Sequence, residues 1–394
     1  MPEMRMPHGG AFDWQCRTRI LFGSGVLERL GMVALDLSRR RRALLVTDMG
    51  IVRVGHADRA RQSLEAAGFL VAVFDATREN PTTLDVDACV EAARAADVDL
   101  LVGLGGGSSI DTAKGANFLL TDGGAMQDYW GVGKVRGEML PLIAIPTTAG
   151  TGSECQSFAL IADEETHQKM ACGDPKATPR VALLDPDLTV SQPKRVTACT
   201  GLDAIAHAVE TAVTRPKNAV SSLYSREAFR QTIRWFPDVL TQPDNIEARS
   251  GMLLGAAYAG LAIENSMLGV AHSLANPLTA HYGIVHGQAV GMMLPHVIRF
   301  NAQEAEAREA YKELAVLVGL ADRKTPGESA ADALARLITD FLQMAEIPTS
   351  LAACGVREEA IPNLAAEAAA QRTAQFNPRP VTIENCTALY RAAL

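Results

Sequence analysis

The stretch VDLLVGLGGGSSIDTAK, residues 98–114, decides the fold. Its first part, Val98–Leu104, has the length and aliphatic character of a buried strand, and its second part passes through residues 105–107, all glycine, into a helical pattern. A glycine-rich turn of this kind brings backbone N–H groups to a helix N-terminus, where a pyrophosphate can bind. The spacing differs from the usual G-x-G-x-x-G fingerprint because Ser108 occupies the last glycine position. Taken alone, the turn is equally compatible with tight packing of a helix on a sheet.

Short apolar runs of the same kind recur on both sides of this stretch. They cover residues 43–47, 69–74, 140–145 and 181–184. Helical patterns at residues 58–67 and 84–96 separate the first runs, and Thr83 is placed to cap the second helix. Because the runs are continuous rather than alternating, both faces of each strand are expected to be buried, as in a parallel sheet flanked by helices. The first half of the chain therefore predicts an α/β, doubly wound domain.

After Pro193 the strand patterns largely disappear. Alanine, leucine and charged residues then recur at helical spacing, for example over residues 222–235, 245–264 and 302–318. A chain of 394 residues also exceeds what one hydrophobic core usually serves. We therefore predict an α/β domain over residues 1–196 and an all-α domain over residues 197–394, with a cleft between them.

Composition excludes several classes of partner. A net charge of −8 argues against nucleic acid, because binding to phosphates needs a clustered positive field. The seven cysteines are scattered and form no Cys-x-x-Cys pair, which is typical of reduced thiols. Met1–Phe12 contain no apolar stretch of signal-peptide length, and the sequence contains no run of about 18 apolar residues. We expect a cytoplasmic protein that binds neither nucleic acid nor a membrane.

A second polar loop, PTTAGTGSE at residues 146–154, follows another predicted strand. Loops that leave a parallel sheet at the carboxyl ends of its strands are where open α/β folds bind ligands. Together with the glycine turn, this loop predicts a cradle for a dinucleotide in the first domain. Asp48, at the end of the strand over residues 43–47, is placed to accept hydrogen bonds from the adenosine ribose, and its charge would repel a 2′-phosphate. This favours NAD over NADP, although Asp48 is also placed to cap a helix.

The helical half contains a set of metal-ligating residue types. Asp203 and His207 are four residues apart and share one face of a predicted helix. His272 and His286 follow in apolar surroundings, and three imidazoles with one carboxylate suit Fe²⁺ or Zn²⁺. Two further histidines of the same segment, His281 and His296, are better explained as buried, hydrogen-bonded side chains. The second domain is therefore predicted to bind a metal.

Four of these motifs together resemble the iron-containing (group III) alcohol dehydrogenases, over nearly the whole length of the chain. They are Gly-Gly-Gly-Ser-x-x-Asp-x-x-Lys at residues 105–114, the loop at 146–154, Gly-x-Asp-x-x-x-His at 201–207, and the paired histidines 272 and 286. The resemblance implies a Rossmann-like domain followed by an all-helical domain, the architecture of dehydroquinate synthase, commonly assembled as a homodimer.

The same resemblance implies roles for individual residues. The metal, usually Fe²⁺ and in some members Zn²⁺, would be held by Asp203, His207, His272 and His286. The dinucleotide site would be lined by Asp48, Asn80, Gly106, Gly107, Ser108, Thr147, Thr148, Thr151 and Lys169. No catalytic residue beyond the metal ligands is implied.

The implied activity is interconversion of a small primary alcohol or diol and its aldehyde by hydride transfer with NAD, with the substrate oxygen on the metal. Two positions depart from some relatives. Asn276 stands where they carry a histidine linked to proton movement, and Phe158 stands where they place polar substrate contacts. Alternatives are a glycerol-dehydrogenase-like activity, a hydroxyacid-oxoacid transhydrogenase and, in a different class, a dehydroquinate synthase-like lyase.

Overall fold

The computed structural model describes residues 11–166 and 168–394, and it divides the chain into two compact units. One unit is Gln15–Gln192, and the other is Pro193–Leu394 together with residues 11–14. The division falls a few residues before the predicted limit at 196/197, because the first helix of the second unit, α6 (Lys194–Thr211), begins directly after Pro193.

The first unit contains a six-stranded sheet in which every neighbouring pair of strands is parallel. The strand order is β1-β9-β6-β4-β2-β3. The strands are β1 (Arg19–Phe22), β2 (Arg42–Val46), β3 (Leu70–Phe74), β4 (Leu100–Gly105), β6 (Leu142–Pro146) and β9 (Val181–Leu184). All five predicted strands are confirmed within a residue or two. The edge strand β1 was not predicted, because its apolar run is only three residues long and follows an arginine.

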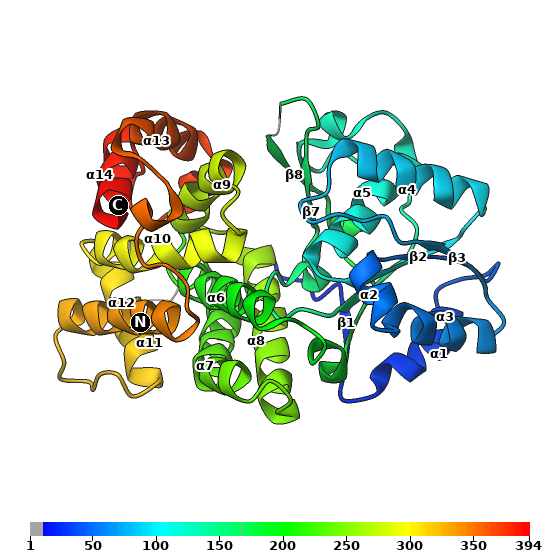
Figure 1. Ribbon diagram of the computed structural model, residues 1–394, viewed down its shortest axis with the longest axis horizontal. Coiled ribbons are helices and arrows are strands. Elements are labelled where there is room, and N and C mark those ends of the chain that lie inside the picture. Colours follow the sequence, from blue (N-terminus) through cyan, green and yellow to red (C-terminus); the bar gives the residue numbers. More distant parts are fainter. Residues whose placement is uncertain (1–10, 167) are drawn as a thin grey trace, which may run out of the picture. The chain divides into compact units, whose positions relative to one another are not determined.

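Helices cover both faces of this sheet, as Figure 1 shows for α4 and α5 on one side of β2 and β3 and for α1 and α3 on the other. The helices are α1 (Leu30–Leu35), α2 (Met49–Arg53), α3 (His56–Ala66), α4 (Thr83–Ala95) and α5 (Gly107–Asp122). Successive residues of β2 belong to opposite cores: Leu44 packs with the core beneath α4 and α5, and Leu45 with the core beneath α1 and α3. This double burial is why the strands read as continuous apolar runs.

The start of α4 differs from the prediction. Thr82 rather than Thr83 is the N-cap residue, and the Asp85 carboxylate accepts a hydrogen bond from the Thr82 N–H at 2.8 Å. A carboxylate three residues after the N-cap residue completes a capping box. Thr83 could not form one, because the residue three positions after it is Val86.

A smaller three-stranded sheet of order β5-β8-β7 was not predicted. It consists of β5 (Gly131–Val132), β7 (Phe158–Ala162) and β8 (Lys169–Gly173), and β7 runs antiparallel to β8. The ring of Phe158 lies so close to Gly173 that a Cβ there would be 2.4 Å from it. Glycine at 173 therefore leaves room for the aromatic ring of Phe158, the residue with which it pairs in the sheet.

Every element assigned in the second unit is a helix. The α-helices are α6, α7 (Ala219–Thr241), α8 (Ile246–Ser266), α9 (Val270–Tyr282), α10 (His286–Asn301), α11 (Ala305–Leu317), α12 (Gly327–Met344), α13 (Ile361–Ala370) and α14 (Ile383–Ala393). Glycines bring some of them close together: a Cβ at Gly251 of α8 would lie 1.9 Å from the Trp235 ring of α7. The predicted all-α character of this part is confirmed.

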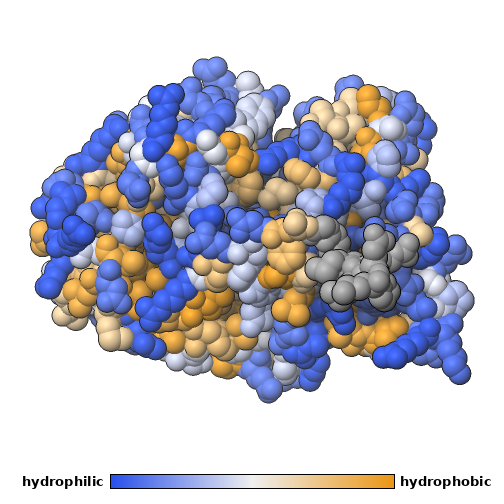
Figure 2. All heavy atoms as spheres, turned by 180° about the vertical axis from the view of Figure 1, so that it is seen from behind, coloured by the Kyte–Doolittle hydropathy of each residue, from blue (hydrophilic) through white to orange (hydrophobic). Residues whose placement is uncertain are grey.

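The surface mixes residue types. On the face drawn in Figure 2, hydrophilic residues cover most of the surface, with hydrophobic residues in patches between them. Within residues 11–166 and 168–394, no single helix is long and apolar enough to cross a bilayer. Among these same residues, one pair of helices, α8 and α9, reaches that length and composition when taken together, with a bend of 107° between them.

Candidate functional site

Three helices of the second unit carry the predicted metal ligands. Asp203 and His207 lie one turn apart on α6, where nearly all of their neighbours are buried. His272 is in the first turn of α9, and His286 is the first residue of α10. The helical spacing seen in the sequence therefore places two side chains on one face, and the packing of α9 and α10 adds the other two.

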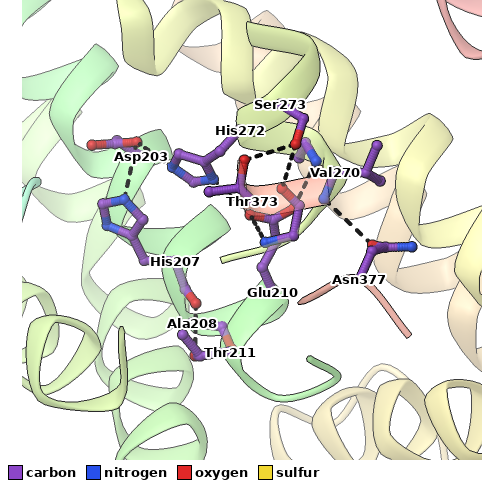
Figure 3. A network of polar contacts seen from close by, with 12 residues as sticks. Asp203, His207, Ala208, Glu210, Thr211, Val270, His272, Ser273, Thr373 and Asn377 are labelled. Carbon is purple, nitrogen blue, oxygen red and sulfur yellow. Dashed lines mark hydrogen bonds and ion pairs between the residues drawn. The ribbon is translucent and has the colours of Figure 1, made fainter. Parts of the chain in front are cut away.

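All three imidazoles converge on one carboxylate oxygen. The Nε2 atoms of His207 and His272 each lie 3.4 Å from Asp203 Oδ1, and His286 Nε2 lies 3.9 Å from it. Potential ligand atoms of Asp203, His207 and His272 all lie within 4.8 Å of one another. Figure 3 shows the two imidazoles of His207 and His272 directed at Asp203. The structure thus brings the four predicted residues together, with His286 slightly farther out and less buried.

Close helix packing makes this convergence possible. Gly287, next to His286, has no room for a side chain, because a Cβ would lie 2.0 Å from the Cys199 carbonyl oxygen of α6 and 3.2 Å from Asp203 Cβ. Gly201 likewise lets α6 meet the Phe236 ring, 2.6 Å from where its Cβ would be. Gly287 thus brings the start of α10 against α6, which places the His286 side chain beside Asp203.

The electrostatics of the cluster suit a cation. Burial would raise the pKa of Asp203, but the surrounding imidazoles, His207 first, more than offset it and hold this pKa well below its usual range. Burial would lower the pKa of His272, but the carboxylates of Glu210 and Asp203 more than offset it and raise the pKa to about 9. The site therefore stabilises positive charge.

The donor atoms also fit a divalent metal. Asp203 Oδ1 and His272 Nε2 are buried, and neither makes a hydrogen bond to any residue that the structure describes. Buried polar atoms are normally hydrogen-bonded, so two such atoms that face each other at 3.4 Å without a hydrogen bond are suited to share a cation. Imidazole nitrogens with one carboxylate oxygen are the donor set that Fe²⁺ and Zn²⁺ accept.

Two other histidines of the segment lie outside the cluster. His281 is exposed and contacts the Glu367 carboxylate at 2.9 Å, so its interpretation as a buried side chain is wrong. His296 is partly buried, and burial lowers its pKa. Asn276, one turn beyond His272, donates a hydrogen bond to Gln371 Oε1 at 3.1 Å. Its amide cannot titrate, so no acid or base stands at that position.

Sequence reasoning missed Glu210, one turn beyond His207 on α6. Its carboxylate lies 2.6 Å from Nδ1 of His272. A signal was present in the sequence: Glu210 stands at helical spacing from His207 in a stretch of alanine, isoleucine and valine. An acidic residue on a buried helix face usually has a specific partner.

In the first unit, the glycine turn joins β4 to α5. Gly105 ends β4 with φ +149°, Gly106 is the N-cap residue and Gly107 is the first residue of α5. The loop 146–154 lies against this turn, since Thr147 N–H donates to the Gly105 carbonyl oxygen at 2.9 Å. A Cβ at Gly107 would lie 2.6 Å from Thr151 Cγ2, whereas a Cβ at Gly106 would lie 3.6 Å from Thr148. The structure therefore brings the two predicted loops together at the N-terminus of α5.

A buried lysine of α5 makes hydrogen bonds to the end of the loop at 146–154 and to Phe158. Lys114 is completely buried, and its Nζ donates to the carbonyl oxygen of Ser153 at 2.6 Å, to Ser153 Oγ at 2.8 Å and to the Phe158 carbonyl oxygen at 2.9 Å. Ser153 Oγ in turn donates to Asp111 Oδ1 at 2.5 Å. The aspartate and lysine of the first motif thus anchor the end of the second motif.

Asp48 follows β2, as predicted, and its two carboxylate oxygens have different surroundings. Oδ1 accepts hydrogen bonds from the N–H groups of Gly50 at 2.8 Å and Ile51 at 3.1 Å, so Asp48 caps α2. Oδ2 faces the glycine turn and lies 3.5 Å from Ser109 Oγ. The helix-cap interpretation is therefore confirmed for one oxygen, while the other lies beside the glycine turn.

The remaining predicted nucleotide residues are placed as follows. Ser108, Thr148 and Thr151 are partly buried around the N-terminus of α5. Lys169, at the start of β8, donates from Nζ to Asn80 Oδ1 at 3.4 Å. Thr147 is completely buried, and its hydroxyl accepts a hydrogen bond from Gln192 at 3.2 Å.

Comparison with known proteins agrees with this geometry. The family model for iron-containing alcohol dehydrogenase matches residues 17–186, and that for the C-terminal part of the Fe-containing alcohol dehydrogenase family matches residues 197–394. The chain is 33% identical to the NAD-dependent methanol dehydrogenase of Bacillus methanolicus over 377 residues, which is 95% of this chain and 97% of the relative.

Two further comparisons point the same way. Alcohol dehydrogenase 4 of Schizosaccharomyces pombe is 33% identical over 374 residues, 95% of this chain and 87% of the relative. The crystal structure of a 1,3-propanediol oxidoreductase superposes with a TM-score of 0.94 at 31% identity, covering 98% of this chain and 100% of that one. The chain belongs to the iron-containing alcohol dehydrogenase family.

Proposed function

We propose that this chain is a metal-dependent, NAD-linked alcohol dehydrogenase that interconverts a small primary alcohol or diol and its aldehyde. The observation that carries the proposal is the convergence of three imidazoles on Asp203 Oδ1 in a buried cluster. Two of the similar proteins are named for methanol and for 1,3-propanediol, which supports a small alcohol or diol as the substrate.

The proposed ligands of the metal are Asp203, His207, His272 and His286. These side chains bind and orient the ion, which is Fe²⁺, with Zn²⁺ as the alternative that the same donors accept. When bound, the metal supplies Lewis-acid polarisation of an alcohol or carbonyl oxygen, and NAD accepts or returns the hydride.

The proposed nucleotide site lies at the N-terminus of α5. Backbone N–H groups at Gly106, Gly107 and Ser108 face the pyrophosphate, where the glycines allow close approach and the helix dipole favours negative charge. Oδ2 of Asp48 accepts from the ribose hydroxyls. The other residues proposed to line the site are Asn80, Thr147, Thr148, Thr151 and Lys169. The Thr147 hydroxyl accepts a hydrogen bond from Gln192, and its N–H donates to the Gly105 carbonyl oxygen.

Three finer proposals follow from the sequence and the family. Residues 1–196 form the dinucleotide-binding domain and residues 197–394 the metal-binding domain. The protein works in the cytoplasm. It assembles as a homodimer.

The test is anaerobic turnover by the metal-stripped chain after addition of Fe²⁺ or Zn²⁺, measured as NADH formation with short primary alcohols, diols and 2-hydroxy acids. We expect NADH only when metal is present, and the panel then identifies the preferred alcohol. Binding of metal and NAD without NADH formation from any alcohol would contradict the proposal. Exchange between a hydroxy acid and an oxo acid without added NAD would instead indicate a transhydrogenase.

A further inference from the structure

The carboxylate of Glu210 lies between a helix N-terminus and an imidazole. Its Oε1 accepts a hydrogen bond from the Ala271 N–H at 2.7 Å, and its Oε2 accepts one from the Gly269 N–H at 3.1 Å. Oε2 also lies 2.6 Å from His272 Nδ1. Figure 3 shows Glu210 on the side of His272 that faces away from Asp203. A single side chain therefore contacts the start of α9 and the ring that α9 carries.

This arrangement determines which nitrogen of His272 carries a proton. Both oxygens of Glu210 already accept hydrogen bonds from backbone N–H groups, so in the contact with His272 it is Nδ1 that carries the proton and donates. The lone pair of the neutral ring is then on Nε2, the atom that lies 3.4 Å from Asp203 Oδ1. In metal sites, a carboxylate on the far nitrogen of a histidine fixes the tautomer and the orientation of the ring.

We propose that Glu210 is a positioning residue of the metal centre, which sets both the tautomer of His272 and the place of the α9 N-terminus through one buried carboxylate. This inference rests on the proposed metal-binding function. The helix α6 would then do more than supply Asp203 and His207, because its Glu210 would also orient a ligand on α9.

The chemistry of the site requires a carboxylate rather than an amide. Three donors, the N–H groups of Gly269 and Ala271 and Nδ1–H of His272, point at Glu210. A glutamine would turn an NH₂ group toward at least one of these donors. With its NH₂ toward His272, the ring would have to place its proton on Nε2, where the metal binds. With its NH₂ toward Ala271, α9 would lose a hydrogen bond at its N-terminus.

The surroundings leave Glu210 little freedom to rearrange. The side chain is 1% exposed, and a Cβ at Gly269 would lie 3.0 Å from its Oε1. Asn377 supports the same helix end from the other side, because its Oδ1 accepts from Val270 N–H at 3.4 Å without contacting the imidazole. The chain therefore offers a matched control that contacts the α9 N-terminus but not His272.

The experiment measures Co²⁺ binding to the metal-stripped full chain by chelator competition, together with the visible spectrum of the Co²⁺ form. We expect Glu210→Gln to weaken Co²⁺ binding by about 10–100-fold and to change the spectrum, because the ring is no longer held in one orientation. Asn377→Ala should lower Tm but leave the affinity within about twofold and the spectrum unchanged, because the hydrogen bonds that it removes join Asn377 to Val270, Asn301 and Arg379 and none of them reaches a metal ligand.

Three outcomes would overturn the inference. If the parent chain binds Co²⁺ and Glu210→Gln binds it equally well with the same spectrum, Glu210 does not position the ligand, and the proposed function still stands. If the parent chain itself takes up no Co²⁺, the proposed function fails and this inference fails with it. Should Glu210→Gln not fold, Glu210→Asp keeps the charge but shortens the reach to His272, and affinity equal to the parent would overturn the inference equally.

Discussion

The imidazole rings of His207 and His272 stack on each other, with centroids 4.8 Å apart and 15° between their planes. Two positively charged rings at this distance would repel each other, so at most one can carry a charge without a large cost. Both Nε2 atoms lie 3.4 Å from the same Asp203 oxygen. The stacked pair is therefore suited to neutral rings that share one cation.

His272→Ala should abolish metal binding, with a loss of more than about 100-fold in affinity, because it removes a ligand rather than a residue that only orients one. NADH formation should be lost with it. The matched control is His281→Ala on the same helix, whose imidazole is exposed and paired with Glu367. Metal content and turnover are the measurements. A His272→Ala protein that retains its metal, or a His281→Ala protein that loses it, would contradict the assignment.

Asp48→Asn should relax the preference for NAD. The asparagine Oδ1 can still cap α2, but the negative charge that opposes a 2′-phosphate is gone. We expect the ratio of kcat/KM for NADP to that for NAD to rise about fivefold or more, which corresponds to about 1 kcal/mol of repulsion in a well-solvated site. Asp48→Ala should show the same change and in addition lose about 1 kcal/mol of stability with the cap. An unchanged ratio in both variants would mean that Asp48 is a helix cap only.

Gly106→Ala should weaken nucleotide binding at the glycine turn without disturbing how the turn folds. The added methyl group has room in the protein, 3.6 Å from Thr148, but it would stand where the pyrophosphate approaches. We expect KM for NAD to rise about tenfold, or ~1.4 kcal/mol, at an unchanged Tm. Gly107→Ala should also lower Tm, because its methyl group would lie 2.6 Å from Thr151. Metal binding serves as the control in both variants, and a Gly106→Ala protein with unaltered KM would argue against a pyrophosphate at this turn.

Glu154→Gln should change how stability depends on pH. Burial raises the pKa of Glu154 from 4.5 to about 7, although the Lys114 ammonium opposes the shift. Between these values the folded protein keeps the proton that the unfolded chain releases, so the free energy of unfolding falls as the pH rises and then levels off. The loss amounts to about 3 kcal/mol. The Tm of Glu154→Gln relative to the parent should therefore rise by roughly 5–10 °C between pH 5 and pH 8, and parallel Tm curves would exclude this ionisation.

How far the sequence predicts the fold depends on the length and continuity of the apolar runs. The strands β2, β4, β6 and β9 are recognisable because helices cover both faces of the sheet, which leaves uninterrupted buried aliphatic runs. The edge strand β3 has one buried residue, but it is recognisable because all five of its residues are apolar. The strand β1 has only three apolar residues after Arg19, and β5 has only two residues, so neither carries a pattern of its own. Phe158–Ala162 is an apolar run, but its pairing with Lys169–Gly173 depends on contacts that periodicity does not reveal.

Some residues of the candidate site could likewise be predicted from the sequence, and others could not. Asp203 and His207 share a helix face by spacing alone, and the density of histidines in one segment pointed to His272 and His286. The role of Glu210 was not predictable, because the same periodicity that puts it near His207 says nothing of the start of α9, which packs against it. The contact of Lys169 with Asn80 joins positions 89 residues apart and likewise follows only from the folded chain.

The buried ammonium of Lys114 ties the loop at 146–154 to the helix that begins at the glycine turn. The conformational entropy of these two segments is therefore lost when the chain folds, and a nucleotide that binds them does not have to order them again. Recognition at a rigid cradle needs no preceding loop rearrangement. Related nucleotides should accordingly associate at similar rates and differ chiefly in how long they remain bound.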